Sequence, residues 1–328
     1  MNSTIDLNQV NPSFLNATTT ALLGRPITDP SVVAAGFRKP YAAFPDNGSL
    51  SQSLRPYPQF QNVWSRNSGL GKTWYESASI KVQRRFGDWQ FQSSYVRSKT
   101  LGLLTFRQIF SQNQVYPQDM YNLTQPKSYL PFDQPNVFNF LSTYDLPFGT
   151  GKKLLNTKSR VLNSIVGGWT IGETHNYRSG ALFALNCANT LGAGVLFTSA
   201  RMCNATGSAI LSGQERRTLD PNNPGSLYFN APAFAIPSQF SFGTSSQYNS
   251  KFRQPPVLID NISIVKSIGL WPGADGNRVR MQISANISNP TNKTNFAING
   301  TVGNANFGRA TAPQLGPRII VLQARLYF

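Results

Sequence analysis

The sequence predicts an all-β fold of antiparallel strands, and three observations lead to this prediction. Only 13% of the 328 residues are charged, whereas 26 Gly, 22 Pro and 12% aromatic residues supply turn and strand chemistry. Glutamate, which helix bundles use heavily, occurs only as Glu76, Glu173 and Glu215. Apolar and polar residues alternate with a period of two in several segments, as in strands that have one apolar side.

The clearest local element is a β-hairpin that runs from Trp74 to Ser98. Its two arms are joined by Gly87-Asp88, a dipeptide typical of two-residue hairpin turns. One face of the arms is polar. The other face is apolar and consists of Ala78, Ile80, Val82, Phe86, Trp89, Phe91 and Tyr95.

The same two-sided alternation predicts further strands downstream, each with an apolar and a polar side. The apolar positions are Phe138, Phe140, Tyr144 and Leu146, then Ile262 and Ile264, then Val279, Met281, Ile283, Ala285 and Ile287, and finally Ile320, Leu322, Ala324, Leu326 and Phe328.

Two architectures share this pattern: a soluble β-sandwich or barrel with an apolar core, and an outer-membrane β-barrel whose apolar side faces lipid. Ten residues at about 3.3 Å each, tilted by about 40°, rise roughly 25 Å, which is the height of a barrel's apolar band. Short connections such as Gly87-Asp88 contrast with long polar ones at residues 101–132 and 185–257. We therefore predict a transmembrane antiparallel barrel with long extracellular loops. The soluble core stays open as the alternative.

In the barrel interpretation, the predicted lipid-facing residues are Ile80, Val82, Phe86, Trp89, Phe91, Phe138, Phe140 and Leu322. Aromatic residues at strand ends would form interfacial girdles, namely Trp74, Trp89, Tyr95, Tyr144, Trp169 and Tyr177. Glu173 and His175 fit less well, because alternation from Trp169 places them on the lipid side, where charge is costly. Either the strand register shifts here, or this stretch lies near the membrane edge or packs against another group.

The net charge of +17 indicates an anionic neighbour. Basic residues occur as scattered pairs such as Arg84-Arg85 and Lys152-Lys153, and no helix-turn-helix, zinc or RNP-type motif surrounds them. We expect no nucleic-acid partner. We expect the basic surface to face outer-membrane lipid and lipopolysaccharide.

Catalytic and metal-binding patterns are absent from the sequence. His175 is the single histidine, and no CxxC or HExxH pattern occurs, so we expect no enzymatic activity, metal or cofactor. Cys187 and Cys203 lie in a Gly/Ala/Asn/Thr-rich stretch typical of a loop. They form either a loop disulfide or two free thiols, and the sequence leaves both open.

Several segments together resemble the carboxy-terminal barrel region of Oar-like TonB-dependent receptors of the acidobacterial type. The resemblance covers roughly residues 11–328 in family order. It rests on Arg55-Pro-Tyr-Pro-Gln-Phe60, Phe132-Asp-Gln-Pro135, Tyr144-Asp-Leu-Pro-Phe-Gly-Thr-Gly-Lys-Lys153, Gly167-Gly-Trp169, Ser179-Gly180, Tyr228-Phe-Asn-Ala-Pro-Ala-Phe234, Asn306-Phe-Gly-Arg309, Pro317-Arg-Ile-Ile320 and Leu326-Tyr-Phe328.

The resemblance implies energised uptake of a bulky, unknown ligand, such as a siderophore, oligosaccharide or peptide. A TonB-type energy transducer would act through a plug, but neither a plug nor a signal peptide is identified in this sequence. We therefore expect a fragment or truncated reading frame, with a loop-rich part at residues 1–73 and strands and loops at residues 74–328. It would supply about 10–14 strands of a larger barrel.

The end of the chain resembles the terminal signal that the outer-membrane assembly machinery reads by strand addition. This assembly signal would comprise Leu326, Tyr327 and Phe328. The alternative functions are a non-transporting surface or adhesion barrel and a secreted β-rich binding protein.

Overall fold

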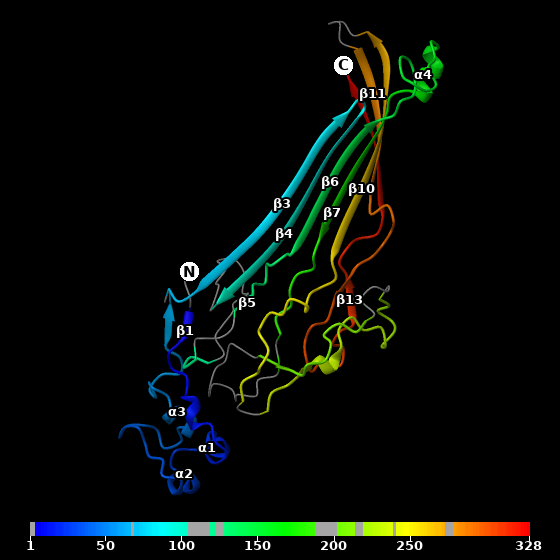
Figure 1. The fold of residues 1–328 in the computed structure, drawn as a ribbon. Helices are drawn as coiled ribbons and strands as arrows, with labels where there is room; N and C mark the ends of the chain where they lie inside the picture. The colour runs from blue at the N-terminus through cyan, green and yellow to red at the C-terminus, as the bar shows by residue number, and fades with distance from the viewer. Residues whose placement is uncertain are drawn as a thin grey trace.

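The computed structural model describes residues 4–66, 69–103, 119–122, 127–185, 187, 202–213, 219–238, 241–272 and 278–328. Its main feature is one twisted, antiparallel, eight-stranded sheet in the order β14-β11-β10-β7-β6-β4-β3, with β5 paired to β4 (Figure 1). The strands are β3 (Lys72–Phe86), β4 (Trp89–Leu103), β5 (Ser128–Tyr129), β6 (Asn136–Asp145), β7 (Trp169–Arg178), β10 (Val257–Pro272), β11 (Arg278–Ser288) and β14 (Ile319–Tyr327).

The connections sort by length to the two ends of the sheet. The turn end joins β3 to β4, β6 to β7 and β10 to β11, and the loop end joins β4 to β6, β7 to β10 and β11 to β14. Gly87 has φ 53°, the positive value that the first central position of a type II′ hairpin turn requires. The carboxyl terminus lies at the turn end (Figure 1).

The connection at residues 146–168 contains the helix α4 (Arg160–Val166), which begins after the N-cap Ser159. Gly168 ends this connection with φ 69°, and a Cβ there would lie 2.3 Å from the Ser267 carbonyl oxygen. The segment is also tied to the hairpin turn, because Lys152 Nζ lies 2.7 Å from Asp88 Oδ1. This hydrogen bond raises the pKa of the Lys152 ammonium group.

The long connections at the loop end pack together into a unit that we call the loop cap. Its core joins residues of the β7–β10 and β11–β14 connections: Leu185, Cys187, Cys203, Leu219, Tyr228, Phe229, Ala233, Phe234, Phe252, Ile298, Val302, Phe307 and Ala310. Short elements accompany it, namely β8 (Asn204–Ala205), η2 (Ala231–Ala233), β9 (Phe234–Ala235), β12 (Phe296–Ile298) and β13 (Ala310–Pro313). Aromatic rings in mostly edge-to-face and tilted contacts dominate this core; the Phe229 and Phe252 centroids are 4.4 Å apart.

The amino-terminal residues form a small helical region beyond the loop end of the sheet (Figure 1). Its elements are β1 (Thr4–Asp6), η1 (Pro12–Phe14), α1 (Ala17–Leu22), α2 (Pro30–Ala34), α3 (Leu50–Ser53) and β2 (Trp64–Arg66). The helices begin at Asn16, Asp29 and Ser49, whose side chains accept hydrogen bonds from backbone amides of the first turn. Leu22, Ile27, Val32, Phe44 and Leu50 form a core of their own.

Fourteen strands occur in the described part of the chain, and eight of them belong to the main sheet. The other six are short: β8, β9, β12 and β13 accompany the loop cap, and β1 and β2 belong to the amino-terminal region. Within the described residues, no helix is long and apolar enough to cross a membrane.

Candidate functional site

The continuous pairing register sorts the side chains of the main sheet onto two faces. Direct partners across antiparallel strands lie on the same face, so one row can be followed across the whole sheet: Phe86, Trp89, Tyr144, Ile171, Ile264, Ala285 and Leu322. A second row on this face contains Ile80, Tyr95, Phe138, Tyr177 and Leu258. We call this the apolar face. Every residue named above as lipid-facing or as part of a girdle lies on it.

The apolar face is uncovered in the described part of the molecule. Ile80 has 66% of its surface exposed and Leu322 has 75%. Aromatic residues of the face are also exposed, with 48% for Phe86 and 38% for Trp89. An apolar surface that extends over seven strands is unfavourable in water and stable against hydrocarbon.

The opposite face, which we call the polar face, carries mainly hydroxyl and amide side chains. Its members include Ser79, Lys81, Gln83, Arg85, Gln90, Gln92, Ser94, Asn139, Thr143, Thr174, Asn176, Asn261, Ser263, Gln282, Ser284, Asn286 and Gln323. A hollow of about 610 Å³ lies near the turn end, lined mainly by polar-face residues such as Gln83, Gln90 and Gln92. The sheet therefore has one apolar and one polar face, as the wall of a barrel with a water-filled lumen does.

Glu173 and His175 lie on the apolar face without any shift of register. His175 Nδ1 is 2.5 Å from Asp260 Oδ1, and His175 Nε2 is 2.7 Å from Glu173 Oε1. Asp260, which pairs directly with His175 across β7 and β10, is therefore the packing partner that the sequence left unnamed. Sharing hydrogen bonds lowers the cost of polar groups on a lipid-facing surface.

This His–carboxylate cluster is held together by hydrogen bonds. His175 is held between two carboxylates and beside the Phe140 ring, whose centroid is 5.9 Å from that of the imidazole. Within the described ranges, no group of three or more His, Cys, Asp or Glu side chains is arranged to hold a metal ion.

A second basic residue on the apolar face is satisfied by the turn-end connection. The Lys266 ammonium donates hydrogen bonds to the carbonyl oxygens of Ile165 and Gly167, at the end of α4. It also lies 5.1 Å from the centroid of the Trp169 ring. Cations favour the carboxyl end of a helix, so α4 and Lys266 stabilise each other at the membrane boundary.

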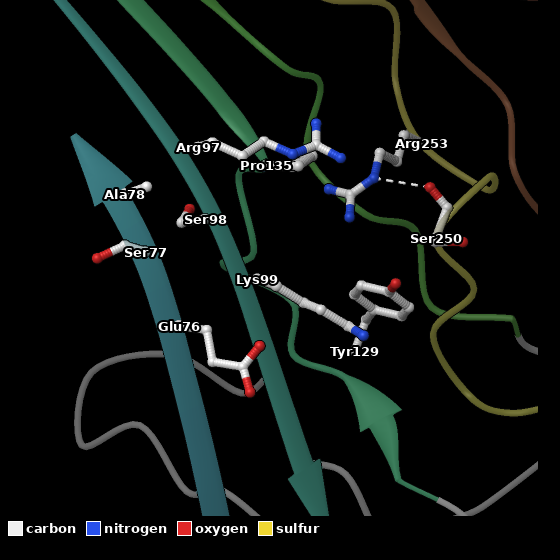
Figure 2. Close-up of a pocket in the computed structure, with 10 residues that line it drawn as sticks. All are labelled: Glu76, Ser77, Ala78, Arg97, Ser98, Lys99, Tyr129, Pro135, Ser250 and Arg253. Carbon is white, nitrogen blue, oxygen red and sulfur yellow. Dashed lines mark hydrogen bonds between the residues drawn. The ribbon is translucent and has the colours of Figure 1, made fainter. Parts of the chain in front are cut away.

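A groove of about 570 Å³ lies at the loop end of the apolar face. Figure 2 shows that β3 and β4 form one wall and that Tyr129, Pro135, Ser250 and Arg253 form the other. Glu76, Ala78, Arg97 and Lys99 reach it from the apolar side of the hairpin. We call this the basic groove, because it combines three cationic side chains with one carboxylate among its lining residues.

Each cationic side chain of the basic groove has a defined interaction partner. Arg97 donates to Asn136 Oδ1 at 2.8 Å. The Arg253 guanidinium donates to the carboxylate and carbonyl of Asp133, which is fully buried. The Lys99 ammonium lies 6.0 Å from the Tyr129 ring centroid. Arg253 forms an ion pair with Asp133, and Arg97 bonds a neutral amide. Lys99 lies directly opposite Glu76 in the β3–β4 register, and the described contacts include no ion pair between them.

The structure joins Cys187 and Cys203 in a disulfide, with 5.3 Å between their Cα atoms. Both residues are buried in the aromatic core of the loop cap. The neighbouring Tyr248 is buried against Leu130 and Leu182, and this burial raises the pKa of its hydroxyl. These contacts tie the three long connections to one another.

The terminal strand β14 lies at one edge of the sheet and pairs only with β11 among the described strands. Leu326 is on the apolar face and Tyr327 on the polar face, where its hydroxyl donates to Gln282 Oε1 at 2.9 Å. Phe328 is 91% exposed. At the other edge, β3 pairs only with β4, so the described sheet is open.

Comparison with known proteins agrees with this geometry. The family whose model matches is described as "Outer membrane beta barrel domain", and the match covers residues 1–321. Searches of curated proteins and of solved structures gave no match. With the family match over almost the whole chain and an antiparallel sheet that has one lipid-compatible face, the protein belongs to the outer membrane beta barrel domain family and is located in the bacterial outer membrane.

Proposed function

We propose that this chain forms the wall and the loop cap of a TonB-dependent receptor-like transporter that takes up a bulky ligand. The observation that carries the proposal is an open, two-faced sheet whose long connections fold into a unit with its own core at one end. A closed barrel of eight strands has an interior that side chains nearly fill. A sheet of eight strands with two free edges fits a wider barrel, in which a large solute has room.

The polar face supports a ligand rich in hydrogen-bonding groups. Its hydroxyl and amide side chains both donate and accept hydrogen bonds, as the hydroxyls of an oligosaccharide and the amides of a peptide or siderophore require. The wall contributes passively: the apolar face meets lipid, and the polar face lines the passage.

The loop cap is suited to ligand capture at the cell surface. Long loops held by a buried disulfide and packed aromatic rings lose less conformational entropy when they bind than free loops do. The amino-terminal region is also linked to the β4–β6 connection, because Gln9 Nε2 donates to Asp119 Oδ1 at 2.8 Å. A preorganised surface of this kind favours binding of a large ligand.

Three partners complete the proposal. A TonB-type energy transducer would act through a plug, and the assembly machinery would recognise the open β14 edge with Leu326, Tyr327 and Phe328 as its signal. Lipid and lipopolysaccharide would surround the apolar face. We propose no enzymatic role and no nucleic-acid partner.

Uptake assays in the source bacterium test the transport function. Cells with and without the gene are given a labelled ferric siderophore, oligosaccharide or peptide, in the presence and absence of a protonophore. The proposal expects uptake of one ligand class that depends on both the gene and the proton gradient, while surface binding survives the protonophore. Gene-dependent uptake that is unchanged by the protonophore would contradict energised transport.

The alternative is a non-transporting surface or adhesion barrel, and the compact loop cap is the observation that favours it. It predicts gene-dependent surface binding without any accumulation inside the cell. A secreted β-rich protein is disfavoured, because its apolar faces would be buried, whereas Ile80 and Leu322 are exposed.

A further inference from the structure

The basic groove lies at the height where the outer leaflet meets water. On β3, ten residues separate Phe86 at the turn end from Glu76 in the groove. Ten residues at about 3.3 Å each, tilted by about 40°, rise roughly 25 Å, the full height of the apolar band. The long loops are at this end, and in outer-membrane barrels long loops are extracellular. The groove is therefore at the outer boundary of the lipid layer.

The groove opens on the lipid side of the wall. Glu76, Ala78, Arg97 and Lys99 all belong to the apolar face, so a solute that crosses along the polar face does not reach them. Directly below them on the same face, exposed Ile80 and Tyr95 are direct cross-strand partners. A cationic groove thus continues into an exposed apolar strip.

The lining of the basic groove has more cationic than acidic side chains. Figure 2 shows the Arg97 and Arg253 guanidinium groups directed towards each other, and the Lys99 ammonium beside Tyr129. Lys127 adds a further cation at this end, with Nζ 4.0 Å from the Trp74 ring centroid. Among the described lining residues, Glu76 alone is acidic, and Asp133 is already engaged by Arg253.

We propose that the basic groove binds a phosphate group of an anionic lipid of the outer leaflet, with the acyl chains on the Ile80–Tyr95 strip. Arginine matches phosphate oxygens with parallel N–H donors, and lysine adds a mobile charge. Tyr129 and Trp74 supply the amphipathic rings that favour the headgroup level. A soluble anion would use the cations alone, whereas a lipid uses the cations and the strip together.

The test uses the full-length protein in neutral detergent, with bis-phosphorylated lipid A as the probe. Bound lipid is counted by native mass spectrometry, and the shift of the unfolding temperature is measured in parallel. We expect phosphorylated lipid A to bind and to stabilise the protein, and lipid A stripped of both phosphates to bind at least about tenfold more weakly. Equal binding of the two lipids would overturn the proposal, and so would equal stabilisation by inorganic phosphate.

Matched variants locate the site. Arg97→Gln combined with Lys99→Gln should weaken binding about tenfold or more. The control, Lys153→Gln with Lys158→Gln, makes the same charge change at exposed positions of the turn-end connection and should bind as the wild type does. Wild-type affinity in the groove variant would refute the assignment.

A third variant, expected to bind the lipid more tightly, keeps the test decisive if the double variant fails to fold. Glu76→Gln removes the one carboxylate of the lining and should bind phosphorylated lipid A about two- to fivefold more tightly. Unchanged or weaker binding would count against the groove. The inference depends on the outer-membrane location and not on transport, so the two proposals fail separately.

Discussion

An arginine substitution on the apolar face distinguishes a sheet that faces lipid from a sheet that faces water. Ile80→Arg is the informative change, because Ile80 is 66% exposed and lies in the middle of β3. In water, replacing an exposed isoleucine by arginine is nearly neutral. At the middle of a bilayer, arginine costs about 2–4 kcal/mol, so the folding equilibrium should fall by roughly 30- to 700-fold.

The control is the neighbouring residue on the other face. Ser79→Arg places the same charge one residue away on the polar face and should change stability by less than about 0.5 kcal/mol. The folded fraction of the full-length protein in lipid vesicles is measured by heat-modifiable gel mobility across a urea series. Equal effects of the two substitutions would refute the assignment of the faces.

Three further predictions concern the loops. Replacing both Cys187 and Cys203 by alanine opens a cross-link over 16 residues and should cost the loop cap about 3 kcal/mol, seen as faster proteolysis of the loops, whereas unchanged proteolysis would argue against a structural bond. Gly168→Ala should lower the unfolding temperature more than Gly151→Ala, because both glycines have positive φ but only Gly168 would meet a carbonyl oxygen; equal losses would show that the contact is unimportant. Burial raises the pKa of Tyr248, so its neutral form stabilises the loop cap below pH about 10 and this stability falls as the unfolded chain ionises above it. Tyr248→Phe should therefore flatten the decline of protease resistance between pH 9 and 11, which Tyr57→Phe at an exposed position should leave unchanged.

Local patterns predicted the wall well because strand geometry is local. The alternation from Ala78 to Tyr95 and the Gly87-Asp88 turn define the hairpin, and the register places these residues as expected. The strands are longer than the alternation alone indicated, since β3 and β4 have 15 residues each and extend past the apolar band. The additional residues, 72–73 of β3 and 99–103 of β4, are held in the strands by their pairing across the hairpin.

Contacts between distant segments were beyond the sequence. Asp260 meets His175 across 85 positions, and Arg253 meets Asp133 across 120. The loop cap core depends on pairs such as Phe252 and Phe307, which lie in two different connections. The one available sign was the misfit of Glu173 and His175 on the apolar side of their strand, which gave no indication of Asp260 as their partner.

Site-directed labelling tests the central claim, that the sheet is a membrane wall with one lipid face and one aqueous face. Single cysteines are introduced at Ile80, Phe140 and Leu322 on the apolar face and at Ser79, Asn139 and Gln323 on the polar face, in a background without Cys187 and Cys203. The account predicts that cysteines on the apolar face resist a membrane-impermeant maleimide, while those on the polar face react. A fluorophore attached to the cysteine in detergent, before reconstitution, should be quenched by nitroxide lipids on the apolar face and not on the polar face. Equal reactivity on both faces, or the reverse pattern, would contradict it.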